Sequence, residues 1–142
     1  MIKKLILFLL FLVALHLQSE IVSDYNNDGK PDKWCSLTGG GKIIITKLDQ
    51  NYDGKVDYIG KHTDKDKPVY EEFDHNHDGR MDTFYFYEEG NLIKEEIDSN
   101  YDGKVDIWIY MHKNIYIKRI EIDSDFDGKV NDVIDYSNRN LK

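Results

Sequence analysis

A nine-residue motif rich in aspartate recurs five times along the chain, and its regular spacing constrains the fold more than any other feature. Successive copies begin 25, 25, 24 and 25 residues apart. They are DYNNDGKPD, DQNYDGKVD, DHNHDGRMD, DSNYDGKVD and DSDFDGKVN, at residues 24–32, 49–57, 74–82, 98–106 and 123–131 (loops 1 to 5). A fixed period in this range is typical of stacked repeat arrays, in which each unit contacts mainly its neighbours.

The residues between the motifs favour β-strands. Short runs of β-branched and aromatic residues lie at Ile43–Ile45, Thr83–Tyr87, Ile107–Tyr110 and Ile115–Ile117. Turn-forming residues lie in the same stretches, at Gly39–Gly41, Thr63–Lys67, Glu88–Asn91 and His112–Asn114. Each repeat therefore reads as strand, turn, strand and Asp-rich loop. Because both connections are short, we predict an all-β fold, an antiparallel meander of about 25-residue repeats with up to ten strands.

Apolar and polar residues alternate only partly along these runs, as in Ile107–Ile109, so the sheet could stay open, coil or close. Two loop positions are regularly apolar. We predict that position 8 points to a core (Val56, Met81, Val105 and Val130). We predict that position 11 forms a core stripe, or alternatively a surface that stacks on carbohydrate (Trp34, Ile59, Phe84, Trp108 and Val133).

Residues 1–19 have the pattern of a secretory signal peptide. Lys3 and Lys4 precede an unbroken apolar run, Leu5–Leu15, which is too short for a helix that must span roughly 30 Å. We expect cleavage after Ser19, which would leave residues 20–142 as a five-repeat domain of net charge −10 with no later transmembrane segment. The alternative is an uncleaved anchor. The protein is thus expected in the periplasm, in the cell envelope or outside the cell.

Composition excludes several classes of function. The chain has 27 acidic and 19 basic residues, which argues against binding to nucleic acid phosphates. Its single cysteine, Cys35, excludes an intramolecular disulfide and a cysteine-based zinc site, and leaves a buried thiol or an intermolecular disulfide. The carboxylates are repeated in near-identical sets, whereas a catalytic site needs one asymmetric arrangement. We therefore predict that the protein is not an enzyme.

The chemistry of the motif lies in oxygen-bearing side chains at alternate positions. Fifteen of the 27 acidic residues occupy positions 1, 3, 5 or 9. Ca²⁺ takes about six to eight oxygen ligands, and glycine at position 6 permits the sharp turn that would aim them at one point. The backbone carbonyl of position 7 is predicted to face the ion, with its cationic side chain pointing away. The predicted calcium ligands are Asp24, Asn26, Asp28, Lys30, Asp32, Asp49, Asn51, Asp53, Lys55, Asp57, Asp74, Asn76, Asp78, Arg80, Asp82, Asp98, Asn100, Asp102, Lys104, Asp106, Asp123, Asp125, Asp127, Lys129 and Asn131.

Some loop residues admit other interpretations. Asn and Asp with Gly are also favoured in metal-free turns. Asn131 replaces the ninth-position Asp in loop 5, where Asp132 or Asp125 could compensate. His75 and His77 occupy positions 2 and 4 of loop 3 and are expected to face solvent, with zinc or copper binding as the alternative. Position 4 is aromatic in loops 2, 4 and 5, which indicates a position that packs on the loop surface (Tyr52, Tyr101 and Phe126).

The loops resemble two known calcium motifs. Their first six positions are similar to the start of an EF-hand loop, but position 12 lacks the bidentate Glu and is Cys35, Gly60, Tyr85, Ile109 or Ile134. The nine-residue form between strands is more similar to the calcium hairpin loops of integrin-type FG-GAP repeats, although the period is shorter and the Phe-Gly/Gly-Ala-Pro signature is absent. Thrombospondin type 3 repeats share tandem Asp-rich loops but are rich in Cys. The resemblance covers the loops alone and implies calcium binding.

The sequence therefore predicts an exported calcium-binding repeat protein with a structural or adhesive role. Each loop would hold one Ca²⁺ and thereby order the β array. The alternative is a calcium-dependent module that recognises a protein or glycan of the envelope through exposed aromatic side chains. Without the twelfth-position Glu, the affinity is expected to be that of weak extracellular sites.

Overall fold

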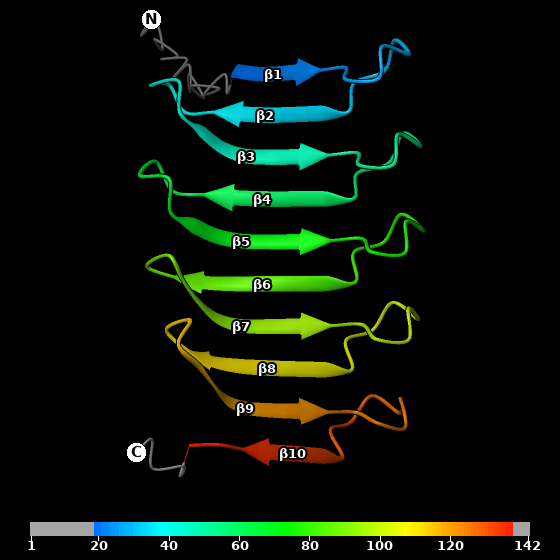
Figure 1. The fold of residues 1–142 in the computed structure, drawn as a ribbon, viewed down its shortest axis with the longest axis vertical. Coiled ribbons are helices and arrows are strands. Elements are labelled where there is room, and N and C mark those ends of the chain that lie inside the picture. The colour runs from blue at the N-terminus through cyan, green and yellow to red at the C-terminus, as the bar shows by residue number, and fades with distance from the viewer. Residues whose placement is uncertain (1–18, 138–142) are drawn as a thin grey trace, which may run out of the picture.

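Residues 19–137 form one antiparallel sheet of ten strands in a computed structural model. The predicted signal peptide, residues 1–19, lies outside the described residues except for Ser19, and residues 138–142 also lie outside them. Each strand pairs with its neighbours in sequence (Figure 1). The strands are β1 (Ser19–Ser23), β2 (Lys33–Leu37), β3 (Ile43–Leu48), β4 (Tyr58–His62), β5 (Pro68–Phe73), β6 (Thr83–Glu88), β7 (Asn91–Ile97), β8 (Ile107–His112), β9 (Tyr116–Ile122) and β10 (Asp132–Asp135).

The predicted all-β meander is confirmed, and the sheet is open, with β1 and β10 at its two ends (Figure 1). Three of the four predicted strand runs begin where the sequence pattern placed them. The prediction of a strand at Ile115–Ile117 is wrong at its start, because Ile115 belongs to the turn and β9 runs from Tyr116 to Ile122. The N–H of Ile115 donates to the carbonyl of His112 at 2.9 Å, which closes that turn.

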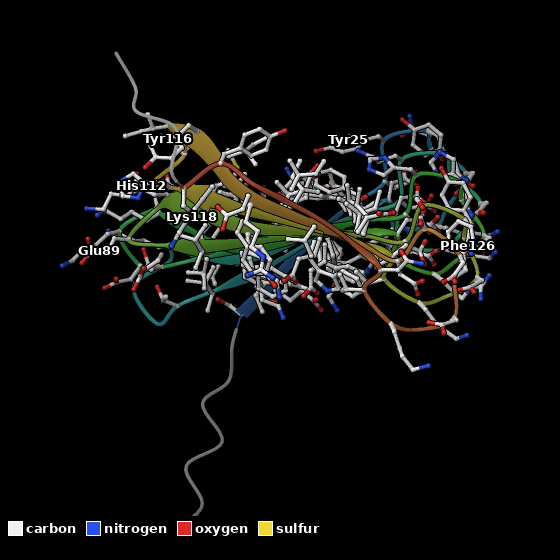
Figure 2. All side chains as sticks on the ribbon, turned by 90° about the horizontal axis from the view of Figure 1, so that it is seen from below. Tyr25, Glu89, His112, Tyr116, Lys118 and Phe126 are labelled. Carbon is white, nitrogen blue, oxygen red and sulfur yellow. The ribbon has the colours of Figure 1, made fainter. Side chains whose placement is uncertain are left out.

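The connections form two rows on opposite sides of the sheet (Figure 1). The five Asp-rich loops follow the odd-numbered strands, and we call this side the loop edge. The four tight turns follow β2, β4, β6 and β8, and we call this side the turn edge. Figure 2 shows Tyr25 and Phe126 on the loop edge, and Glu89 and His112 on the turn edge. Strands β2, β4, β6 and β8 each have a register shift just before the turn that follows, at equivalent positions, such as between Ser36 and Leu37 in β2.

The sheet is a single layer, so the predicted core is absent from the described residues. Side chains extend from both faces (Figure 2), and the buried hydrophobic residues are only Cys35 and Leu37. The predicted core stripe at position 11 is wrong: Trp34 is half-buried and pairs with Lys47, and Val133 is 52 % exposed. Position 8 is half-buried at Val56, Met81 and Val105 and 40 % exposed at Val130, so it does not form a fully buried core either. Because both faces meet water, neither face needs to be uniformly apolar.

Hydrogen bonds between tyrosine and glutamate lie on both faces of the sheet, across strands on one face and within β5 on the other. Glu71 accepts hydrogen bonds from the Tyr58 hydroxyl at 3.0 Å and the Tyr87 hydroxyl at 2.6 Å. On the opposite face, the Tyr70 hydroxyl donates to Glu72 at 2.7 Å. Burial, together with the adjacent Glu71 carboxylate, raises the pKa of Tyr58 to about 12. These phenols therefore stay neutral donors well above neutral pH.

Candidate functional site

The first aspartate of each loop organises the turn that follows it. In loop 3, Asp74 Oδ2 accepts the N–H of Gly79 at 2.7 Å, and Oδ1 accepts the N–H of Asp78 at 3.3 Å. The bond to the glycine N–H recurs in all five loops at 2.7–2.9 Å. Since the carboxylate bonds the backbone on its own loop, the chain curls around position 1. This side chain is at most 4 % exposed in the last four loops: Asp49, Asp74, Asp98 and Asp123.

Positions 3 and 5 tighten the same curl. The Asn76 side-chain oxygen accepts the N–H of Asp78 at 2.9 Å, and Asp78 Oδ1 accepts the N–H of Arg80 at 2.9 Å. The second of these contacts, from position 5 to position 7, occurs in all five loops. Side-chain oxygens of positions 1, 3 and 5 are thereby held on one loop. Hydrogen bonds from Lys55 N–H and from Arg80 also keep the pKa of Asp53 and of Asp78 below the usual value.

The ninth-position side chain fastens the end of the loop to its beginning. In loop 3, Asp82 Oδ2 accepts the N–H of His75 at 2.8 Å and of Asn76 at 3.3 Å. The same pair of bonds occurs in loops 1, 2 and 4. In loop 5, Asn131 keeps the first bond, because its side-chain oxygen accepts the N–H of Ser124 at 2.8 Å. The ninth-position aspartates Asp32, Asp57, Asp82 and Asp106 are at most 2 % exposed.

Position 4 adopts a left-handed backbone in every loop. Its φ lies between 59° and 66° for residues of very different size: Asn27, Tyr52, His77, Tyr101 and Phe126. Asn tolerates this conformation, whereas a bulky aromatic residue is strained in it. The glycine at position 6 also has positive φ, between 89° and 94°. Strain of this kind persists only where surrounding contacts hold it, and in these loops the hydrogen bonds of positions 1, 3 and 5 do so.

Consecutive loops are joined directly to one another. The N–H of Asp49 donates to the carbonyl of Asp32 at 2.8 Å, and the same contact links each later pair of loops at the same distance. Two position-7 side chains add further links: Lys55 Nζ donates to the carbonyl of Asp78 at 2.9 Å, and Arg80 donates to the carbonyl of Tyr101 at 3.1 Å. Lys55 thus points away from its own loop, as predicted. That prediction is wrong for Arg80 and Lys129, which also contact the position-5 carboxylate of their own loop, Asp78 at 2.8 Å and Asp127 at 3.2 Å.

The most buried side chains of the described region are carboxylates, which reverses the usual order of burial. Eight aspartates are at most 4 % exposed, and Asp57 is completely buried. The Nδ1 atom of His77 lies 3.0 Å from Asp57 Oδ1, which has no other hydrogen-bond donor among the described residues. Asp57 Oδ1 therefore accepts a hydrogen bond when Nδ1 of His77 carries a proton. This hydrogen bond raises the pKa of His77. His77 was expected to face solvent, and its side chain is 40 % exposed, but its contact also joins position 4 of one loop to position 9 of the preceding loop.

Loop 5 brings three carboxylates together. Single oxygens of Asp123, Asp125 and Asp127 lie within 4.8 Å of one another, and the group could hold a metal ion. Burial acts to raise the pKa of Asp123, but the N–H groups of Gly128 and Asp127, which donate to its carboxylate, lower it overall. Asp125 thus supplies a third carboxylate in the loop that lacks the ninth-position aspartate. Asp132 instead accepts a hydrogen bond from Ser124 Oγ at 2.8 Å.

The structure places most predicted site residues in two groups within each loop. Positions 1, 3 and 5 share one set of backbone contacts, and position 9 binds the N–H groups of positions 2 and 3. Sequence reasoning missed the contacts of His77, Lys55 and Arg80 with neighbouring loops. The fixed repeat period could have predicted contacts of this kind, because it places equivalent side chains of successive loops side by side.

Comparisons with known proteins show only a distant likeness. No protein family and no curated protein matches the chain. A solved structure described as the accessory secretory protein 1, 2 and 3 of Streptococcus pneumoniae is similar over 73 % of this chain, at 13 % identity and a TM-score of 0.47. The match spans 20 % of that other chain. Within residues 19–137, no helix is long and apolar enough to cross a membrane.

Proposed function

We propose that this chain is an exported calcium-binding repeat protein in which Ca²⁺ at the five loops orders an extended sheet with a structural or adhesive role. The observation that carries this proposal is the burial of eight aspartates along one edge of the sheet. Among these, Asp57 is the only one in a salt bridge within the described region, and its partner is His77. Closely spaced anionic groups repel one another, and a divalent cation would relieve that repulsion.

The donor set fits a hard cation. Loops 1 to 4 offer carboxylate and carboxamide oxygens at positions 1, 3 and 5, and loop 5 gathers three carboxylates within 4.8 Å. All-oxygen sets of this kind suit Ca²⁺ rather than thiophilic metals. The ligands would be the side chains of positions 1, 3, 5 and 9 and the carbonyl of position 7. We treat the loops as binding sites rather than a catalytic centre because they repeat one arrangement.

Calcium would stabilise a sheet that has only one layer. A domain normally buries an apolar face against a second layer, but here the buried hydrophobic residues in the described region are Cys35 and Leu37 alone. Full hydrophobic burial is therefore limited to two residues, and a bound metal would supply a further source of stability. Metal binding free energy becomes folding free energy when the site exists only in the folded state. Five Ca²⁺ ions would also balance the net charge of −10 expected for residues 20–142.

Calcium titration of chelator-stripped protein by calorimetry and circular dichroism tests the proposal. We expect saturation near five ions, a gain of β signal and a higher melting temperature. Asp127→Asn should remove about one ion from the stoichiometry, because it neutralises part of the carboxylate group in loop 5. Asp66→Asn, in the turn Thr63–Lys67 on the opposite edge, is the matched control and should leave it unchanged. No heat and no spectral change up to tens of millimolar calcium would contradict the proposal.

A second candidate function is calcium-dependent recognition of a protein or glycan. It is favoured by exposed aromatic side chains at position 4, where Tyr52, Tyr101 and Phe126 are 44–48 % exposed. Consecutive loops are two strands apart, about 9–10 Å along the sheet, so the rings of loops 2, 4 and 5 lie along the same edge. Replacing the three rings by Ala should abolish polysaccharide co-sedimentation and preserve calcium stoichiometry. Co-sedimentation that survives this change would contradict the second candidate.

A further inference from the structure

The two ends of the sheet are unpaired strands with complementary surfaces. Within residues 19–137, β1 pairs only with β2, and β10 pairs only with β9. An unpaired edge exposes N–H and C=O groups that can add a further strand. Both edges are also apolar, with Ile21, Val22, Val133 and Ile134 exposed by 52, 53, 52 and 43 % respectively.

The four strand pairs that are joined by tight turns, β2–β3, β4–β5, β6–β7 and β8–β9, show how a further strand would align. In each pair, the residue after position 9 of one loop lies opposite the residue before position 1 of the next, as in Lys33 opposite Leu48 and Tyr58 opposite Phe73. The same register, continued past the end of the sheet, sets Asp132 against Ser23 of a second copy. Val133 then meets Val22, and Ile134 meets Ile21. All four exposed apolar side chains of the two ends are matched in one register.

Strand direction and loop contacts agree with this register. Odd strands run one way and even strands the other (Figure 1), so β1 of a second copy would lie antiparallel to β10. Inside the chain, the position-1 N–H of each of loops 2 to 5 donates to the position-9 carbonyl of the preceding loop at 2.8 Å. Within the described residues, the Asp24 N–H of loop 1 and the Asn131 carbonyl of loop 5 do not form this loop-to-loop hydrogen bond. In the continued register, the Asp24 N–H of a second copy would donate to the Asn131 carbonyl of the first.

We propose that copies of this chain assemble head to tail, with β10 of one copy pairing with β1 of the next and continuing the sheet and its loop edge. The contact is heterologous and advances along the sheet, so it generates filaments rather than closed dimers. One pair opposes assembly, because the same register brings Glu20 opposite Asp135. None of the four turn-joined strand pairs has like charges at the equivalent position. The residues there are Ser36 with Ile45, Lys61 with Tyr70, Phe86 with Lys94, and Tyr110 with Arg119.

This charge pair gives a sharp test by sedimentation velocity and negative-stain microscopy. The protein is the full chain as an exporting host processes it, with its N-terminus determined by mass spectrometry. We expect a concentration-dependent ladder of species in multiples of one chain. Glu20→Lys should lower the concentration needed by about three- to fivefold, because it replaces a like-charge pair with an opposite-charge pair. Adding Asp135→Lys to Glu20→Lys should reverse that gain, because two lysines then face each other.

Variants at the apolar pairs complete the test. Val133→Lys or Val22→Lys should abolish the ladder, since each removes the same cross-strand contact. Val69→Lys, at a side chain of β5 that is 43 % exposed, is the control and should leave assembly intact. The proposal is overturned if the wild-type and Glu20→Lys chains stay monomeric at millimolar concentration, or if Val133→Lys assembles like the wild type.

Discussion

The loop edge and the turn edge both reverse the chain, but they do so under different constraints. The turns differ in length, with five residues between β2 and β3 and two between β6 and β7. The loops share nine positions, the same glycine contact and the same left-handed fourth residue. Chain reversal alone tolerates such variation. The uniform loop edge therefore meets an additional requirement, which we propose to be the binding of an ion at every repeat.

Breaking a ninth-position contact should produce the largest difference between the two edges. Asp82→Ala removes the acceptor of two backbone N–H groups, those of His75 and Asn76, and should lower the free energy of unfolding by about 3 kcal/mol in saturating calcium. Asp64→Ala, an exposed residue of the turn edge, should change it by less than about 0.5 kcal/mol. Urea titrations measure both values. Equal effects of the two variants would remove the distinction between the edges.

The isosteric variant separates the hydrogen bond from the charge. Asn131 keeps the contact with the N–H of Ser124 in loop 5, so Asp82→Asn should retain most of the stability that Asp82→Ala loses. It should still weaken calcium binding at loop 3, because one carboxylate is neutralised. Calorimetric titration of this variant beside wild-type protein distinguishes the two roles of position 9.

Glycine substitutions should give the next largest effect. Gly54→Ala places a side chain at φ +90°, which should cost about 1–2 kcal/mol through backbone strain, since nothing lies within 4 Å of the added carbon. Gly40→Ala on the turn edge has no left-handed φ, and its added carbon would meet only Thr38 Oγ1 at 3.7 Å. Thermal unfolding should show a clear loss for the first variant and none for the second.

Relieving strain at position 4 should stabilise the loop edge slightly. Tyr52 has φ 66°, whereas loop 1 has Asn27 at the same position with φ 60°. Tyr52→Asn should therefore raise the free energy of unfolding by about 0.5–1 kcal/mol, because Asn tolerates this backbone better. Tyr25→Asn is the control, since Tyr25 is exposed and has no left-handed φ. A destabilised Tyr52→Asn protein would show that the ring contributes more than its strain removes.

The smallest expected effect concerns the faces of the sheet. Because the pKa of Tyr58 is raised from 10.0 to about 12, the folded protein holds the phenol proton more tightly than the unfolded chain does. Its contribution is fully present below about pH 10 and is lost as the pH rises toward 12. An ultraviolet titration should show several late-ionising phenols, because the pKa values of Tyr70 and Tyr87 are raised as well, and Tyr58→Phe should remove one of them. An unshifted titration would indicate that this face is solvated.

Much of the architecture could be predicted from sequence because it follows from a period. The spacing of Asp74 and its equivalents fixes the repeat, and runs such as Thr83–Tyr87 identify the strands. Burial could not be predicted in this way. Trp34 and Val130 suggested a core because apolar residues usually find one, but a single-layer sheet provides no second surface. The contact between His77 and Asp57 was also out of reach, since it depends on how adjacent loops stack.

The link between successive loops has a consequence for how the molecule comes apart. All strand pairs in substantial contact are sequence neighbours, and each loop is joined to the next by one backbone hydrogen bond such as that from Asp74 to Asp57. Stability in such a one-dimensional array is a sum of unit and neighbour contributions. Fraying should therefore advance inward from both ends. Amide hydrogen exchange would then be fastest in β1 and β10 and slowest near β5 and β6, as in a zipper that opens from its two free ends.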